Sequence, residues 1–344
     1  MVGWRSQGLL QMAFELINST HLAIHLLMVN VASAAPIFCI YLERRASRSD
    51  DFANRLGIQI AKAAVAMLVL GSMLGLTIGL LGWFQGRTLY VEVLPRFSWK
   101  IYWGITEIFF SLICMGIYIA MWRRTVQERR RVFVHRTLAI LAASNLLYHF
   151  PPLFGVMTYV AENVNHFEDS ISISVFRGLA YSQNVLPMTV HFFLAAFSVS
   201  GIFVMARANA LKSNGEADEE SRRSIYRGAA RVALAATALQ VIVGTWVLVS
   251  TDPWQQHQLL GGNLLATAAL LTSVLLTFAL GHLLGTASIG SPDANTVRGL
   301  VSIVVLIVFL MTWAQRESRQ APQAPANVSS TEISDQEVLR CDLT

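Results

Sequence analysis

The sequence predicts an all-α integral membrane protein, a bundle of about eight transmembrane helices. The 344-residue chain is 54% hydrophobic and only 14% charged, whereas a soluble domain carries about 25% charged residues. The apolar residues lie in blocks close to the length of about 20 residues that a helix needs to cross a bilayer. Helices satisfy their backbone groups inside lipid, and β-barrel strands would instead show short alternating segments. A basic face on a soluble fold is missing, so no nucleic-acid partner is expected.

The predicted transmembrane bundle covers residues 19–314. The first block runs into Glu43-Arg44-Arg45 without a clear cleavage site, which favours a retained helix over a signal peptide. Residues 1–18 are expected to form an outer segment before the bundle. Residues 315–344 are rich in Ala, Pro, Ser and Glu and are predicted to be a disordered tail. The eight predicted spans are 19–42, 59–83, 99–122, 136–160, 182–206, 229–250, 261–284 and 297–314.

Basic residues predict the orientation of the chain. Arginines crowd into the connections 43–58, 123–135 and 207–228, whereas the connection 251–260 holds no basic residue. Basic connections mark the cytoplasmic side of a membrane. The sequence therefore predicts a multi-pass protein of the inner (cytoplasmic) membrane, in contact with lipid, with both termini on the outer side.

Histidines gather on one side of this predicted topology. An ionisable side chain inside a span is costly and suggests a functional site. Neutral imidazoles from two helices are the usual axial ligands of a b-type haem. The alternative is an interhelical hydrogen bond, and His21 lies near enough to the interface for that. Of the eight histidines, six fall on the outer side: His21, His25, His149, His166, His191 and His257.

Two carboxylates also stand out. Glu107 lies inside the third span, where a carboxylate is expensive unless it is protonated, paired or metal-bound. It is therefore a candidate catalytic proton-relay group or haem ligand, with a protonated, helix-bonded Glu as the alternative. Glu317 at the outer end of the eighth span is a candidate cofactor contact or a solvated interfacial charge. The three cysteines form no CxxC motif, which argues against c-type haem attachment and iron–sulfur clusters.

Several stretches carry a family resemblance. They are His25-Leu26-Leu27-Met28-Val29, Glu107, Ser144-Asn145-Leu146, Val190-His191 followed by Ser200-Gly201-Ile202-Phe203, and the set Trp313, Glu317, Arg319 and Gln320. Over most of residues 19–320 these features resemble subunit I of the cytochrome bd quinol oxidases, as a divergent and shortened relative.

The resemblance implies one to three b-type haems, with quinone as a further cofactor and a second membrane subunit as partner. It implies that His25 ligates a haem, that His191 ligates the low-spin haem and that Glu317 contacts a high-spin haem. The seventh span has no Met for the family's second low-spin ligand, and His257, just ahead of that place, is the candidate second axial ligand of the haem iron. His149 and His21 are further candidates for cofactor binding.

Departures from the family leave the activity open. The connection 251–260 is much shorter than the family's quinol-binding loop, and the ninth helix is missing. The expected function is a haem-b subunit of a respiratory electron-transfer complex, an oxidoreductase that resembles a quinol oxidase. A non-oxidase cytochrome b that passes electrons between quinone and an external c-type cytochrome is one alternative. A haem-free transporter or structural membrane subunit is the other.

Overall fold

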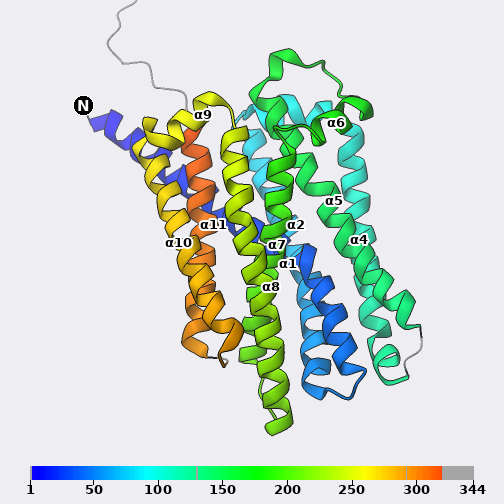
Figure 1. The fold of residues 1–344 in the computed structure, drawn as a ribbon. Helices are drawn as coiled ribbons and strands as arrows, with labels where there is room; N and C mark the ends of the chain where they lie inside the picture. The colour runs from blue at the N-terminus through cyan, green and yellow to red at the C-terminus, as the bar shows by residue number, and fades with distance from the viewer. Residues whose placement is uncertain (1, 129–130, 292, 320–344) are drawn as a thin grey trace, which may run out of the picture.

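Long helices build the molecule (Figure 1). The computed structural model describes residues 2–128, 131–291 and 293–319. In this part of the chain, eight helices are long and apolar enough to cross a membrane, which confirms the predicted fold class. Their bounds are α1 Val2–Ala46, α2 Asp51–Phe84, α4 Ser98–Glu128, α5 Val132–Glu162, α7 Leu186–Ala210, α8 Glu216–Ser250, α10 Leu264–Ile289 and α11 Ala294–Ser318.

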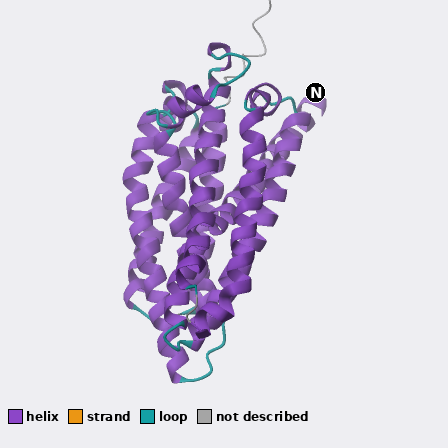
Figure 2. Cartoon of the chain, turned by 90° about the vertical axis from the view of Figure 1, so that its right-hand side faces the viewer, coloured by secondary structure: helices purple, strands orange, loops and turns teal. Residues whose placement is uncertain are grey.

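Short elements cover one end of the bundle, which we call the capped end. The N-terminus, α6 and α9 lie there, at the top of Figure 1. The other end, called the basic end, holds the connections that follow α1, α4, α7 and α10 (Figures 1 and 2). The short elements are η1 Leu89–Val93, α3 Leu94–Arg96, η2 Val164–His166, α6 Ile173–Ala180, α9 Pro253–His257 and η3 Gln258–Gly262.

Polar side chains fix where several helices begin. The Asp50 carboxylate accepts the Ala53 N–H at 2.9 Å ahead of α2, and Asp293 accepts the Thr296 N–H at 2.7 Å ahead of α11. Asn263 caps α10 in the same way. These bonds satisfy backbone donors that the first helical turn leaves without a partner.

Helix α1 is the central element. It packs against α2, α5, α7 and α11, and it is the most buried of the eight spans. The helix begins at Val2, so the predicted outer segment 1–18 continues directly into the first span. At 1.5 Å per residue its 45 residues extend well beyond the ~30 Å hydrocarbon layer. Of the predicted tail, residues 315–318 belong to α11, and residues 320–344 lie outside the described residues.

Two main cores hold the bundle together. The larger one joins α1, α2, α4, α5, α7 and α8 with α10 and α11, mostly toward the basic end. The second core lies at the capped end, where Phe97 and Phe176 pack edge to face with ring centroids 6.3 Å apart. Arg96 donates to the carbonyls of Val164 and Phe167 at 3.1 and 2.9 Å, which ties the loop before α6 to α3.

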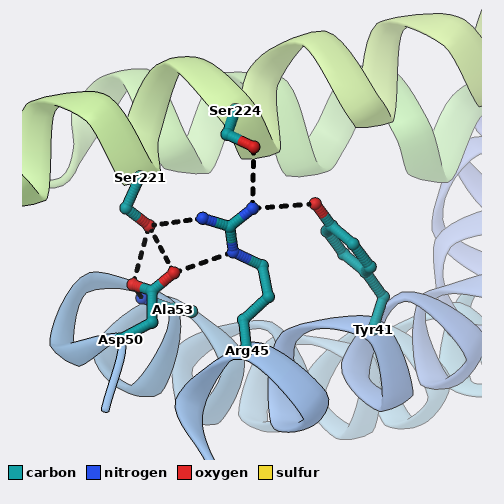
Figure 3. A network of polar contacts seen from close by, with 6 residues as sticks. All are labelled: Tyr41, Arg45, Asp50, Ala53, Ser221 and Ser224. Carbon is teal, nitrogen blue, oxygen red and sulfur yellow. Dashed lines mark hydrogen bonds and ion pairs between the residues drawn. The ribbon is translucent and has the colours of Figure 1, made fainter. Parts of the chain in front are cut away.

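A polar network closes the basic end (Figure 3). The Arg45 guanidinium donates to the Asp50 carboxylate at 2.7 Å and to the Ser224 hydroxyl at 2.7 Å. Ser221 donates to both Asp50 oxygens at 2.7 and 2.8 Å. Because Arg45 and Asp50 belong to the corner between α1 and α2, the network fastens this corner to the start of α8.

Candidate functional site

Three ionisable side chains meet between α4 and α5 near the capped end. The Lys100 ammonium nitrogen lies 2.9 Å from Nδ1 of His149 and 3.5 Å from Oε1 of Glu107. The same Nδ1 of His149 lies 2.9 Å from Oε1 of Glu107. Lys100 and Glu107 are 7% and 9% exposed and His149 is 29% exposed, so the imidazole is the member that reaches the surface of the bundle. We call these three residues the Lys–Glu–His cluster.

Neighbouring polar groups hold Glu107 in place. The Asn145 side-chain amide donates to the Glu107 backbone carbonyl at 2.8 Å and to the Ser111 hydroxyl at 2.9 Å. Ser111 donates in turn to the carbonyl of Ala142 at 3.4 Å. These bonds lock the register of α4 against α5, because each one joins the two helices.

The Glu107 side chain has one oxygen in use and one free. Oε1 receives the contacts of Lys100 and His149, whereas Oε2 is buried and has no hydrogen-bond partner among the described residues. An unpartnered buried acceptor costs free energy. Glu107 and His149 are predicted from the sequence, but Lys100 is not, because it lies three residues into α4 and resembles an interfacial lysine. Its distance of seven residues from Glu107, two helical turns, was the available signal.

His25 lies in the interface between α1 and α2. Its Nδ1 is 2.8 Å from the Gly71 carbonyl oxygen, so this nitrogen carries the proton and donates. The ring rests on Gly75, where an added Cβ would lie only 2.8 Å from Cε1 of His25. The two glycines, one helical turn apart, are what make room for the imidazole between the helices.

His191 lies in a different interface, between α7 and α8. Its Nδ1 is buried without a hydrogen-bond partner in the described part of the chain. The ring faces Gly244 of α8, where an added Cβ would lie 3.8 Å from Cε1. The imidazole is therefore within ordinary van der Waals reach of α8, and one of its ring nitrogens is unsatisfied.

The other predicted histidines have different surroundings. The His257 ring is exposed at the end of α9, where it stacks on Trp254 with centroids 6.4 Å apart. His21 bonds the Ile17 carbonyl of its own helix through Nδ1 at 2.8 Å. His25, His191 and His257 lie on three different helices, α1, α7 and α9, and no hydrogen bond between described residues joins them. Their roles as haem ligands stay predictions.

Glu317 is buried, not solvated. It is 8% exposed at the end of α11, next to Arg316, which pairs with Glu15 of α1. Arg87 approaches the other oxygen of Glu15 at 3.7 Å. The alternative of a solvated interfacial charge therefore does not describe Glu317, and its role as a cofactor contact stays a prediction.

A metal site of three or more His, Cys, Asp or Glu side chains is not found among residues 2–128, 131–291 and 293–319. A haem needs only one or two axial side chains from the protein, so the fit to haem depends on single imidazoles. His25 fits, because its Nδ1 is bonded to the Gly71 carbonyl, which holds the ring in place and leaves Nε2 as the ligand atom. His191 fits through its buried, unpartnered ring nitrogen.

Comparison with known proteins supports the fold. No family model and no curated protein matches the chain. Among solved structures it is similar to a chain from "The structure of bd oxidase from Geobacillus thermodenitrificans", with a TM-score of 0.65 and 12% identity. The similarity covers 95% of this chain and 92% of that chain, so the two have similar lengths. The protein therefore has a cytochrome bd oxidase-like membrane fold.

Proposed function

We propose that the chain is a haem-b-binding subunit of a membrane electron-transfer complex of the cytochrome bd type. The observation that carries the proposal is the setting of His25. Its Nδ1–H donates to the Gly71 carbonyl, which leaves the lone pair of Nε2 free for iron. In metal sites the ring N–H of a ligating histidine is usually donated to a backbone carbonyl or a carboxylate in this way.

His191 is the second proposed ligand. Leaving the buried Nδ1 without a partner costs about 1–3 kcal/mol, and coordination of iron by this nitrogen would remove this cost. The absence of a side chain at Gly244 leaves space beside the ring. A bound haem would supply one-electron chemistry, and the chain would hold it, orient it and keep water away.

The partners follow from the same proposal. A second membrane subunit, or an external c-type cytochrome, would receive or deliver electrons, and quinol is the proposed donor. The basic end is proposed to face the cytoplasm of a cell with an inner membrane, because arginines gather there. The capped end, with the N-terminus, would then face outward.

Optical spectroscopy of the full chain purified in detergent tests the proposal. The reduced-minus-oxidised spectrum should show a b-type α band, and a pyridine haemochrome assay should give at least one haem per chain. His25→Ala and His191→Ala should each remove part of the signal. The matched controls are His166→Ala and His282→Ala, because both imidazoles are exposed. Haem-free protein from haem-replete cells would contradict the proposal and favour a transporter or structural subunit.

A non-oxidase cytochrome b is a second candidate, favoured by the fold of the connection between α8 and α10. This stretch forms α9 and η3, and the Gln256 amide closes it by donating to the Thr251 carbonyl at 2.8 Å. Gln255 fastens it to Glu162 of α5 at 2.8 Å. It leaves no long segment for a quinol-binding loop. Oxygen consumption with a quinol substrate separates the candidates, since an oxidase consumes oxygen and the alternative does not.

A further inference from the structure

We propose that the Lys–Glu–His cluster binds the hydroxyl headgroup of a quinol that enters from the lipid. The inference rests on the proposed electron-transfer function and names where its donor binds. The site lies between α4 and α5, apart from the connection between α8 and α10. Four features support it: the donor and acceptor geometry of the cluster, its access to lipid, its charge, and its packing toward His25.

Hydrogen positions in the cluster allow two tautomers of His149. The Lys100 ammonium only donates and the Glu107 carboxylate only accepts. Nδ1 of His149 touches both groups at 2.9 Å, so it either accepts from Lys100 or donates to Glu107. When Nδ1 donates to Glu107, Nε2 is free to accept a hydroxyl proton from outside. When Nδ1 accepts from Lys100, Nε2 carries the proton.

His149 gives the cluster its access to lipid. Of the three side chains it is the most exposed, and Nε2 has no hydrogen-bond partner among the described residues. The Tyr148 ring, 63% exposed, packs edge-on against the imidazole with centroids 5.0 Å apart. A lipid-facing aromatic ring beside a free imidazole nitrogen suits a flat ring that carries a hydroxyl group.

The first proton transfer balances within the cluster. The quinol O–H bond breaks and an Nε2–H bond forms on His149, while the Nδ1–H proton passes to Glu107. The quinol becomes a quinolate anion and Glu107 becomes neutral. Lys100, released from the Glu107 charge, then neutralises the quinolate, so the net charge of the site does not change. This accounts for an ammonium group that is 7% exposed inside a membrane span.

A structural ion pair alone would explain less. Lys100 and Glu107 could neutralise each other without an imidazole at the surface. In addition, Oε2 of Glu107 has no partner among the described residues, and the side chain that carries it is nine-tenths buried. A free carboxylate oxygen at this position is useful if Glu107 receives protons. It only costs free energy if Glu107 does no more than pair with Lys100.

An apolar cluster joins the helices that carry the Lys–Glu–His cluster to the helices that hold His25. Leu68 of α2 packs in one hydrophobic cluster with Ile108 of α4 and Phe150 of α5, the residues next to Glu107 and His149. Leu68 lies one helical turn before Gly71, which holds the His25 ring. A bound quinol would therefore lie on helices that pack directly against those of the proposed haem ligand.

Photolabelling tests the site on the full chain in lipid nanodiscs, with an azido-quinone as the probe. Mass spectrometry should place the label in residues 98–110 or 145–162, and unlabelled quinol should compete with it. His149→Phe should lower labelling at least tenfold. His166→Phe, a matched exposed histidine outside the spans, should leave it unchanged. Label confined to residues 251–263, no label, or full labelling of His149→Phe would overturn the proposal.

A double variant guards against misfolding. Lys100→Met with Glu107→Gln removes both buried charges together, so neither charge is left unpaired. It should keep the helical circular dichroism and melting of the wild type while it loses the labelling; labelling at the wild-type level would overturn the proposal. Haem content is measured on the same samples. Labelled but haem-free protein would retain the quinol site and reject the haem proposal, so the two failures are distinguishable.

Discussion

His135 and Glu43 face each other at 2.8 Å, Nδ1 to Oε2, and both side chains are fully buried. The other ring nitrogen of His135 donates to the Tyr118 carbonyl at 2.8 Å, and the ring stacks on Tyr118. Arg136 donates to the second Glu43 oxygen at 2.9 Å. One carboxylate thus joins α1 to α5, and the imidazole continues the connection to α4.

Glu43→Ala should therefore be strongly destabilising. Removing one partner of a buried ion pair leaves the other charged or polar group without compensation, at a cost of about 3–5 kcal/mol. Chemical denaturation in detergent, followed by circular dichroism, measures the change in the free energy of unfolding. The control is Glu220→Ala, whose side chain is exposed and should change it by less than about 0.5 kcal/mol. Equal effects would rule out a special role for Glu43.

Protonation of Asp50 at low pH should lower the stability of the fold. Burial alone would raise the pKa of Asp50, but bonds from the Ala53 N–H, Ser221 and Arg45 outweigh it, and the net pKa is lowered. A lowered pKa stabilises the fold above the ordinary aspartate value of about 3.9, and this contribution is lost as pH falls through the lowered pKa.

Asp50→Asn keeps a helix cap but removes the charge. Its melting temperature should lie below that of the wild type at neutral pH, and the difference should shrink as the pH falls below about 4. Melting of both proteins in detergent between neutral pH and about pH 3 checks this. A difference that stays constant over this range would show that the Asp50 charge does not contribute.

Gly75→Ala should displace the His25 ring. The new Cβ would lie 2.8 Å from Cε1 of His25, so the ring must move and its bond to Gly71 must weaken. We expect a loss of about 1–3 kcal/mol from overpacking, together with loss of the haem signal assigned to His25. Gly79→Ala is the control, because its Cβ would meet its nearest neighbour, Tyr90, at 3.9 Å. Haem spectra and melting curves of the two variants test this prediction, and identical behaviour of Gly75→Ala and Gly79→Ala would refute it.

Gly201→Ala should separate α7 from α8. Its Cβ would lie 2.9 Å from the Ala229 backbone carbonyl, which gives way less easily than a side chain. Overpacking of about 1–3 kcal/mol should exceed the gain of about 1 kcal/mol in helix propensity. In Gly281→Ala the same gain in helix propensity is not offset by overpacking, because no atom lies within 4 Å of the added Cβ. Unfolding free energies should therefore move in opposite directions in these two variants.

The sequence predicted the spans but not how their faces pair. Apolar blocks separated by arginines are enough to locate eight membrane helices, and the fold class is confirmed. Within a span, lipid-facing and core-facing positions are both apolar, so periodicity does not tell which face meets which neighbour. The sequence singles out His25 and His191 as imidazoles inside predicted spans, but it does not show that each lies in a different helix interface.

The polar clusters depend on the same missing information. Lys100 and His135 fall near predicted span ends, where lysine and histidine are ordinary interfacial residues. Only the packing of α4 against α5 brings Lys100 to Glu107, and only the packing of α1 against α5 brings His135 to Glu43. Such pairings are relations between distant segments, and one sequence without structural context does not contain them.

Helix α8 is longer than the hydrocarbon layer requires. Its 35 residues reach about 50 Å, against about 30 Å for the membrane core. The surplus turns carry Glu216, Asp218 and Glu219 and begin directly after Gly215. A stiff helical stub that stands clear of the bilayer is a natural attachment point for a rigid fusion partner at residues 212–215. Such a chimera would give cryo-electron microscopy the particle mass and asymmetric outline that a small, membrane-embedded bundle does not have by itself.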